Sequence, residues 1–316
     1  MSTITRREWL NLTLGAGAAL TFDPEDLFGQ QRLITRVIPS SGERLPVIGL
    51  GSSATFAQVA RTEDITALRE VFKTLLDNGA TLFDTAPQYG ASEEVAAKIV
   101  RDAGWSDRLF WATKVNVAGR GNAVANPSAA RAQIDTSLER IGRARIDLIQ
   151  VHNLGDVPTQ LPILREYKQQ GKIKYLGVTT TFDQQYDELV AILKREQLDF
   201  IGVDYAIDSR EVEETILPLA RDRGVAVLAY APFGRTRLFR RVGDRPLPDW
   251  AAEFDAKTWA QFFLKWVLGN TTVTATTPAT SQARNMLDNI GGGIGRVPDQ
   301  AMRRRMSAFI DALPNV

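Results

Sequence analysis

Short apolar runs alternate with helix-period segments from about residue 45 to the end of the chain. The runs are rich in Val, Ile, Leu, Phe and Thr and predict eight strands, over residues 46–51, 81–84, 109–114, 146–152, 174–179, 200–205, 225–230 and 273–277. Between them apolar residues recur every three or four positions and predict helices near residues 62–79, 92–103, 126–142, 160–170, 186–196, 210–223, 256–268 and 281–290. Apolar strands that alternate with amphipathic helices indicate a parallel sheet covered by helices.

Eight strand–helix units predict a closed (β/α)8 TIM barrel, as a single domain over residues 30–316. The rival arrangement is an open, doubly wound sheet, which normally has a glycine-rich phosphate turn after its first strand. Residues 49–51 carry two of the required glycines and lack the third, and the glycine-rich residues 291–295 follow a helix. The α/β barrel is therefore the predicted fold.

The N-terminus differs from the rest of the chain. Arg6 and Arg7 precede a weakly apolar stretch that ends at Leu20 and is too short to cross a bilayer. This pattern resembles a twin-arginine export signal, and residues 16–18 fit a small-residue cleavage site. We expect residues 1–29 to be a leader and the protein to be periplasmic or exported. The alternative is an amphipathic leader on a cytoplasmic protein; no later segment predicts a membrane helix.

Composition narrows the chemistry. The 316 residues include no cysteine and one histidine, and 38 Lys and Arg balance 37 Asp and Glu. The chain therefore has no disulfide, no thiolate nucleophile and no Cys-ligated metal, and we expect no metal site. Near-neutral charge argues against nucleic-acid binding. Chemistry must come from Asp, Glu, Lys, Tyr and the single His152.

Polar residues stand at the ends of three successive predicted strands. Asp84 ends the second, Lys114 the third and His152 the fourth, and Tyr89 follows Asp84 by one loop. Barrel enzymes place their chemistry at the carboxyl ends of strands, so these residues are expected on one rim. Each residue alone could have a purely structural role. Asp84 could cap a turn and Lys114 could extend to solvent, while His152 and Tyr89 could be packed in the core. Their joint occurrence favours one site.

This group suits proton transfer coupled to hydride delivery. A buried lysine needs a counter-charge, and Asp84 is the candidate partner of Lys114. The Lys114 ammonium is expected to lower the pKa of Tyr89, which then acts as acid or base. His152 is expected to donate a hydrogen bond to a carbonyl oxygen. No side chain carries hydride, so a cofactor must supply it.

The same segments resemble the aldo-keto reductase superfamily, in order along residues 35–312. The resemblance implies NAD(P)H-dependent reduction of aldehydes or ketones, or oxidation of the alcohols. It implies Tyr89 as the acid/base, Asp84 and Lys114 as the groups that tune it, and His152 as the group that orients a small carbonyl substrate. The similar segments are residues 45–51, 83–94, 112–115, 147–153 and 229–234.

The resemblance also implies a cofactor site, with Tyr230 stacked on the nicotinamide. The chain departs from the family pattern at Thr179-Thr180, where a Ser-Asn pair is usual, and at Gly202, where a glutamine is usual. Ala279 stands where a basic residue is usual, and Asn285 where an arginine is usual, with Arg284 beside it. The resemblance therefore favours NADP(H) over NAD(H) only through Arg284, because an arginine pairs with a 2′-phosphate and Ala279 cannot. The implied cofactor-binding residues are Gly51, Ser52, Asp84, Thr179, Thr180, Tyr230, Pro232, Phe233, Gly234, Arg235, Pro278, Thr280, Arg284, Asp288 and Asn289.

Two other functions remain open at this point. One is a non-catalytic barrel that binds the nicotinamide nucleotide and acts as a sensor with a protein partner, although no sequence feature indicates such a partner. The other is an aldolase that forms a Schiff base on Lys114. The neighbouring Asp84 argues against the aldolase, because it keeps the ammonium charged.

Overall fold

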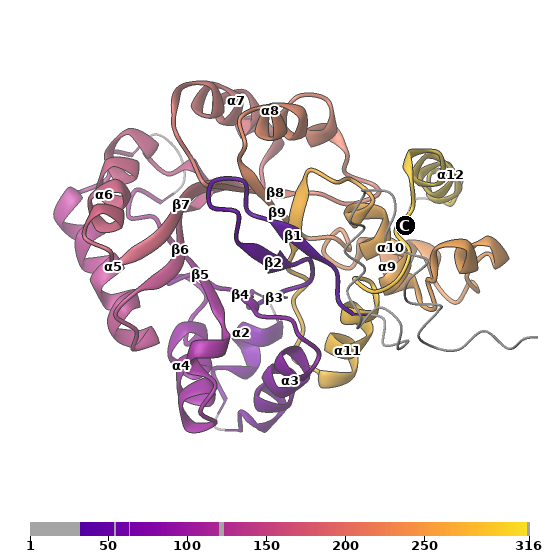
Figure 1. Cartoon of the computed structure of the whole chain (residues 1–316), viewed down its shortest axis with the longest axis horizontal. Helices are drawn as coiled ribbons and strands as arrows, with labels where there is room; N and C mark the ends of the chain where they lie inside the picture. Colours follow the sequence, from indigo (N-terminus) through magenta and orange to yellow (C-terminus); the bar gives the residue numbers. More distant parts are fainter. Residues whose placement is uncertain (1–31, 54, 63, 120–122, 315–316) are drawn as a thin grey trace, which may run out of the picture. The chain divides into compact units, whose positions relative to one another are not determined.

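Eight parallel strands curl into a closed barrel in the computed structural model, which describes residues 32–53, 55–62, 64–119 and 123–314. Each strand pairs with the next in the chain, and the Gly49 and Gly51 amides donate to the Thr276 and Pro278 carbonyls to join the last strand to the first. Figure 1 shows this ring of strands. They are β3 (Leu50–Gly51), β4 (Leu82–Asp84), β5 (Phe110–Val115), β6 (Ile146–Val151), β7 (Ile173–Thr180), β8 (Phe200–Asp204), β9 (Ala226–Tyr230) and β10 (Val273–Thr276).

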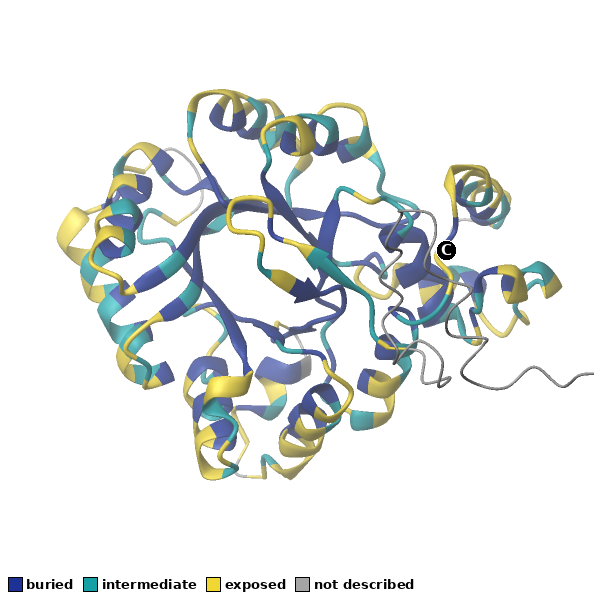
Figure 2. Ribbon diagram, in the orientation of Figure 1, coloured by how far each residue is buried: buried dark blue, intermediate teal, exposed yellow. Residues whose placement is uncertain are grey.

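Helices surround the barrel, and their buried residues face the interior of the molecule. Figure 2 shows the strands as buried and the helices as buried on the barrel side and exposed outside. The fold confirms the predicted α/β barrel. The helices are α2 (Thr55–Val59), α3 (Thr66–Asp77), α4 (Ser92–Asp102), α5 (Pro127–Ile141), α6 (Val157–Gln169), α7 (Tyr186–Arg195), α8 (Ile216–Asp222), α9 (Arg237–Val242), α10 (Trp259–Leu268), α11 (Ala283–Gly291) and α12 (Gln300–Asp311).

The element boundaries differ from the predicted ones at a few places. The helix expected from residue 62 begins at Thr66, where the Asp64 carboxylate accepts from the Thr66 amide at 2.9 Å. The helix expected from residue 210 is a 3-10 turn followed by α8. The strand expected over residues 46–51 is divided between β2 (Arg44–Pro46) and β3. Within residues 46–290, helices α2 and α9 were not predicted, because five or six residues carry too little periodicity.

A hairpin closes the amino-terminal end of the barrel. It is formed by β1 (Thr35–Val37) and β2, which pair antiparallel and cross the barrel in Figure 1. Ile38 and Leu45 of this hairpin pack with Phe110 and Phe200, the first residues of β5 and β8. The barrel interior is therefore filled from that end, and the carboxyl ends of the strands form the other.

The predicted leader, residues 1–29, lies outside the described residues. Among the helices that the structure describes, none is long and apolar enough to cross a membrane.

Candidate active site

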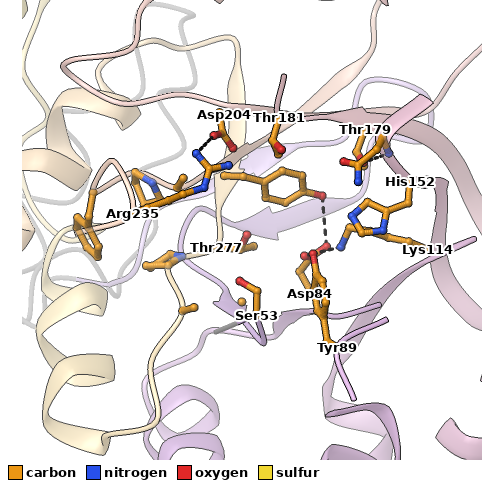
Figure 3. Close-up of a pocket in the computed structure, with 18 of the residues that line it drawn as sticks. Ser53, Asp84, Tyr89, Lys114, His152, Thr179, Thr181, Asp204, Arg235 and Thr277 are labelled. Atoms are coloured by element: carbon orange, nitrogen blue, oxygen red, sulfur yellow. Dashed lines mark hydrogen bonds and ion pairs between the residues drawn. The ribbon is translucent and has the colours of Figure 1, made fainter. Parts of the chain in front are cut away.

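A cavity of about 440 Å³ opens at the carboxyl ends of the strands, within the size range of ligand pockets. Figure 3 shows its lining side chains, which come from most of the strands of the barrel. All four predicted catalytic residues, Asp84, Tyr89, Lys114 and His152, line it. The structure therefore brings these four side chains to one cavity, as the strand-end argument predicts. The other lining residues are Gly51, Ser53, Asn153, Thr179, Thr181, Phe182, Asp204, Tyr230, Ala231, Pro232, Phe233, Arg235, Thr236, Thr277, Pro278 and Ala279.

Lys114 and Asp84 form a buried ion pair at the floor of the cavity. The Lys114 ammonium donates to Asp84 Oδ2 at 2.7 Å and to the Thr85 carbonyl at 2.8 Å. The two side chains are 1% and 6% exposed, so solvent screens the pair very little. Burial opposes the charge on Lys114, but Asp84 and Tyr89 outweigh it and raise the pKa of the ammonium above its usual value. Burial raises the pKa of Asp84, and Lys114 offsets that effect only in part.

Tyr89 lies beside this pair, with its ring centroid 5.4 Å from the Lys114 ammonium. The sequence predicted that Lys114 lowers the pKa of Tyr89. The ammonium does act in that direction, but burial is the larger effect, and Asp84 and Asp204 add to it, so the pKa of Tyr89 is raised. The net shift is thus opposite to the prediction, and the phenol is protonated in the unliganded protein. It can therefore serve as a proton donor.

His152 faces Tyr89 from the adjoining wall of the cavity. The two rings are nearly perpendicular, with centroids 5.9 Å apart. His152 follows β6 and begins a short 3-10 helix, η3 (His152–Leu154), whose Asn153 has a positive φ of 55°. The His152 carbonyl accepts from the Asn116 side chain at 2.8 Å, which fixes the backbone at this turn. The imidazole and the phenol therefore border the same space, where a carbonyl oxygen can contact both.

Tyr230, the last residue of β9, reaches across the barrel toward the ion pair. Its hydroxyl lies 3.3 Å from Asp84 Oδ1 and 3.1 Å from Gln150 Oε1. The pKa of Tyr230 is raised well above its usual value. Burial is the largest cause, and the charges of Asp84 and Tyr89 add to it. The sequence did not single out Gln150, although a glutamine two residues before His152 on an apolar strand was a signal for it.

The predicted cofactor residues divide into two groups. Besides Asp84, those at the cavity wall are Gly51, Thr179, Tyr230, Pro232, Phe233, Arg235 and Pro278. The remainder do not line this cavity: the Asp288 carboxylate accepts from Thr258 and Gln261, and the Thr180 hydroxyl bonds to Gln185. That second group is Ser52, Thr180, Gly234, Thr280, Arg284, Asp288 and Asn289.

Asp204 is a lining residue that the sequence reasoning missed. It ends β8, so the strand-end criterion that selected Asp84 applied equally to it. Arg235 forms an ion pair with Asp204 at 2.5 Å, and both side chains also border a smaller, polar cavity of about 290 Å³. Burial raises the pKa of Asp204, against the effect of Arg235. Within the described part of the chain, no group of three or more His, Asp or Glu side chains is placed to hold a metal.

Known proteins match this chain over most of its length. The model of the "Aldo/keto reductase family" matches residues 47–304. Aldo-keto reductase YhdN of Bacillus subtilis is 32% identical over 206 residues, which cover 63% of this chain and 61% of that protein.

Solved structures of aldo-keto reductases have the same fold. Aldo-keto reductase AKR11C1 from Bacillus halodurans, in its holo form, superposes with a TM-score of 0.69 at 23% identity, over 88% of this chain and 96% of that one. An aldo/keto reductase from Klebsiella pneumoniae in complex with NADP and acetate also gives 0.69 at 23% identity, over 89% of this chain and 96% of that one.

Proposed function

The chain belongs to the aldo/keto reductase family of oxidoreductases, and from that premise we propose that it reduces aldehydes or ketones with NADPH. One observation carries the proposal: a protonated, half-buried Tyr89 and a buried ammonium, Lys114, border the same cavity as His152. A nicotinamide cofactor supplies the hydride when it is bound. The protein's own part is to orient the carbonyl and to deliver a proton to its oxygen.

The proton comes from Tyr89. As negative charge develops on the substrate oxygen, the phenol donates its proton and becomes a phenolate next to Lys114. The ammonium stabilises that phenolate, and Asp84 holds the ammonium in place through its 2.7 Å contact. His152 borders the same space and donates a hydrogen bond to the substrate oxygen. Since the pKa of Tyr89 is raised, the resting protein is ready for reduction, and alcohol oxidation requires deprotonation first.

The cavity fits a nicotinamide nucleotide. Its wall continues from the strand-end residues along residues 230–233 and 235–236 to Thr277, and the Thr277 hydroxyl is buried without a hydrogen-bond partner among the described residues. Arg235, with a side chain 61% exposed, presents a cation at the rim for the diphosphate. The Klebsiella relative in complex with NADP supports the choice of cofactor. Arg284 is the candidate contact for the 2′-phosphate, and Arg284→Ala should weaken NADPH binding and leave NADH binding unchanged.

Steady-state turnover tests the proposal. The purified protein is assayed with NADPH and NADH against a panel of aldehydes and ketones. Tyr89→Phe is expected to lower kcat by about a hundredfold or more, because it removes the proton donor. Tyr167→Phe is the matched control, since Tyr167 lies on α6 and its hydroxyl bonds to Asp135 at 2.8 Å.

Other outcomes lead to other functions. Failure to bind either nucleotide, measured by fluorescence titration, would overturn the proposal. Tight binding without turnover of any carbonyl would support the sensor instead. Trapping of a substrate on Lys114 by borohydride would support the aldolase, which the short contact with Asp84 argues against.

We also propose that residues 1–29 direct the protein out of the cytoplasm. The paired Arg6 and Arg7 before a short apolar stretch support this. The test compares the full chain with a variant that carries Arg6→Lys and Arg7→Lys. We expect the full chain in the periplasmic fraction in a shortened form and the variant in the cytoplasmic fraction. Equal distribution of the two would contradict the proposal.

A further inference from the structure

We propose that Tyr230 is a positioning residue whose hydroxyl holds the second oxygen of Asp84, and that Gly202 provides the space that permits this. The inference rests on the proposed reductase function and deepens it, because it adds a member to the proton-transfer group. It concerns the hydroxyl of Tyr230, whereas the family resemblance implies only that its ring stacks on the cofactor.

Gly202 and Tyr230 fit each other. Gly202 lies in β8, next to β9, and a Cβ added to it would lie 2.6 Å from the Tyr230 hydroxyl oxygen and closer still to the ring carbon Cε2. No real Cβ tolerates such contacts, so any other residue here would displace the ring. The glutamine usual at this position in the family would do so too. The deep position of Tyr230 is therefore a feature of this chain's own sequence.

The hydroxyl then bridges three strands. Tyr230 ends β9, Asp84 ends β4 and Gln150 lies in β6, so the contacts at 3.3 Å and 3.1 Å cross the barrel interior. Gln150 is fully buried, and its Nε2 donates to the Val178 carbonyl at 3.4 Å, which turns its Oε1 toward the phenol. Since both neighbours of the hydroxyl are acceptors, the phenol is the donor, and its single proton is shared between Gln150 Oε1, the nearer at 3.1 Å, and Asp84 Oδ1 at 3.3 Å. Its raised pKa keeps that proton in place.

This arrangement places a donor at each Asp84 oxygen. Oδ2 accepts from Lys114, and Oδ1 accepts a share of the Tyr230 hydroxyl proton, so both contacts favour the same orientation of the carboxylate. The ammonium in turn lies 5.4 Å from the ring centroids of both Tyr89 and Tyr230. Without the Tyr230 hydroxyl, Asp84 Oδ1 would be a buried acceptor that has lost its hydrogen-bond donor. Asp84 would then bind a proton more readily, and its hold on Lys114 would weaken.

Several other groups influence Asp84 and its partner, and the test must allow for them. They are Lys114 on β5, Tyr89 after β4, Glu93 on α4 and Asp204 on β8. None of these is altered in Tyr230→Phe, which removes one oxygen and keeps the ring. A change in the pH behaviour of this variant is therefore attributable to the Tyr230 hydroxyl.

Tyr230→Phe is the first test, with Tyr167→Phe as the matched control. We expect kcat to fall about tenfold with a small change in KM, as for the loss of one hydrogen bond to a charged group. The acid limb of the kcat/KM profile should move to higher pH, because the hydroxyl is one of the groups that lower the pKa of Asp84. A ring that only packs or stacks would leave this limb in place.

A second readout needs neither cofactor nor turnover. The assay is urea unfolding of the ligand-free protein, and Tyr230→Phe should lose more stability relative to wild type near neutral pH than at about pH 5. The variant raises the pKa of Asp84 in the folded state, so protonation of Asp84 at low pH offsets part of the loss. Gly202→Ala should show the same pH dependence, since it keeps the phenol and moves it away from Asp84. If Tyr230→Phe fails to fold, Gly202→Ala remains as the test.

The outcomes separate the two proposals. If the wild type reduces no carbonyl, the proposed function fails, but the unfolding experiment still tests the role of the hydroxyl. If the wild type is active and Tyr230→Phe matches it in kcat, in the acid limb and in the pH dependence of unfolding, the positioning role is refuted.

Discussion

Loss of the Lys114 ammonium is the perturbation whose effect follows most directly from the structure. In Lys114→Met the ammonium is lost and a chain of similar length remains. Asp84 then either holds an unpaired charge or takes up a proton, in a site where its side chain is 6% exposed, and the Thr85 carbonyl loses a 2.8 Å donor. Breaking a buried ion pair in this way lowers the free energy of unfolding by about 3–5 kcal/mol at neutral pH.

The loss should depend on pH in a definite direction. Burial already raises the pKa of Asp84 in the folded wild type, and without Lys114 it rises further. From about pH 4 upward the folded variant then binds more protons than the unfolded chain, so its stability falls as the pH rises. Below about pH 4 Asp84 is protonated in both states and its contribution to the loss disappears.

Urea unfolding at about pH 5 and about pH 7 measures this effect. The difference between wild type and Lys114→Met should be larger at the higher pH. The double variant Asp84→Leu with Lys114→Met should recover most of the stability, because a neutral apolar pair carries no buried charge. A loss that is equal at both pH values, or a Lys114→Met variant as stable as wild type, would show that Asp84 is not a buried charge held by Lys114.

Three further results are expected. Since the pKa of Tyr89 is raised above its usual value of about 10, kcat/KM for reduction should not fall on account of Tyr89 until the pH exceeds that value, as a pH–rate profile would show. Gly177→Ala should lower the free energy of unfolding by about 1–3 kcal/mol in urea titrations, because its Cβ would collide with the Phe200 backbone carbonyl. Arg235→Ala should raise the Kd for NADPH about tenfold in a fluorescence titration, with exposed Arg304→Ala unchanged.

The sequence was sufficient to predict the barrel, and the placement of Asp84, Lys114 and His152 on one rim, for one physical reason. In a parallel barrel every strand ends on the same rim, so the position of a residue along its strand decides which end of the barrel it occupies. Asp84, Lys114 and His152 follow that rule, and Asp204 does so as well. Asp204 lies outside the segments that resemble the family, so only its position at the end of β8 indicated it.

The pKa of Tyr89 required the structure. The sequence places Lys114 nearby and predicts a lowered pKa, but the sign of the shift depends on a balance between charge and burial. Burial, Asp84 and Asp204 together exceed the effect of the ammonium. The contact of Tyr230 with Asp84 is of the same kind, because it crosses the barrel between strands that are not neighbours. The pattern of residues along the sequence does not give the distance between side chains on strands that are not neighbours.

The buried pair is better explained by the chemistry of Tyr89 than by stability. A well-packed apolar pair at the positions of Asp84 and Lys114 would fold as well or better, because two desolvated charges recover little free energy from each other. What an apolar pair would not provide is a fixed positive charge 5.4 Å from the Tyr89 ring. At rest, burial keeps the phenol protonated and the ammonium is satisfied by Asp84 and the Thr85 carbonyl. When the proton leaves, the ammonium is already in position to stabilise the phenolate, so no side chain must move during the step.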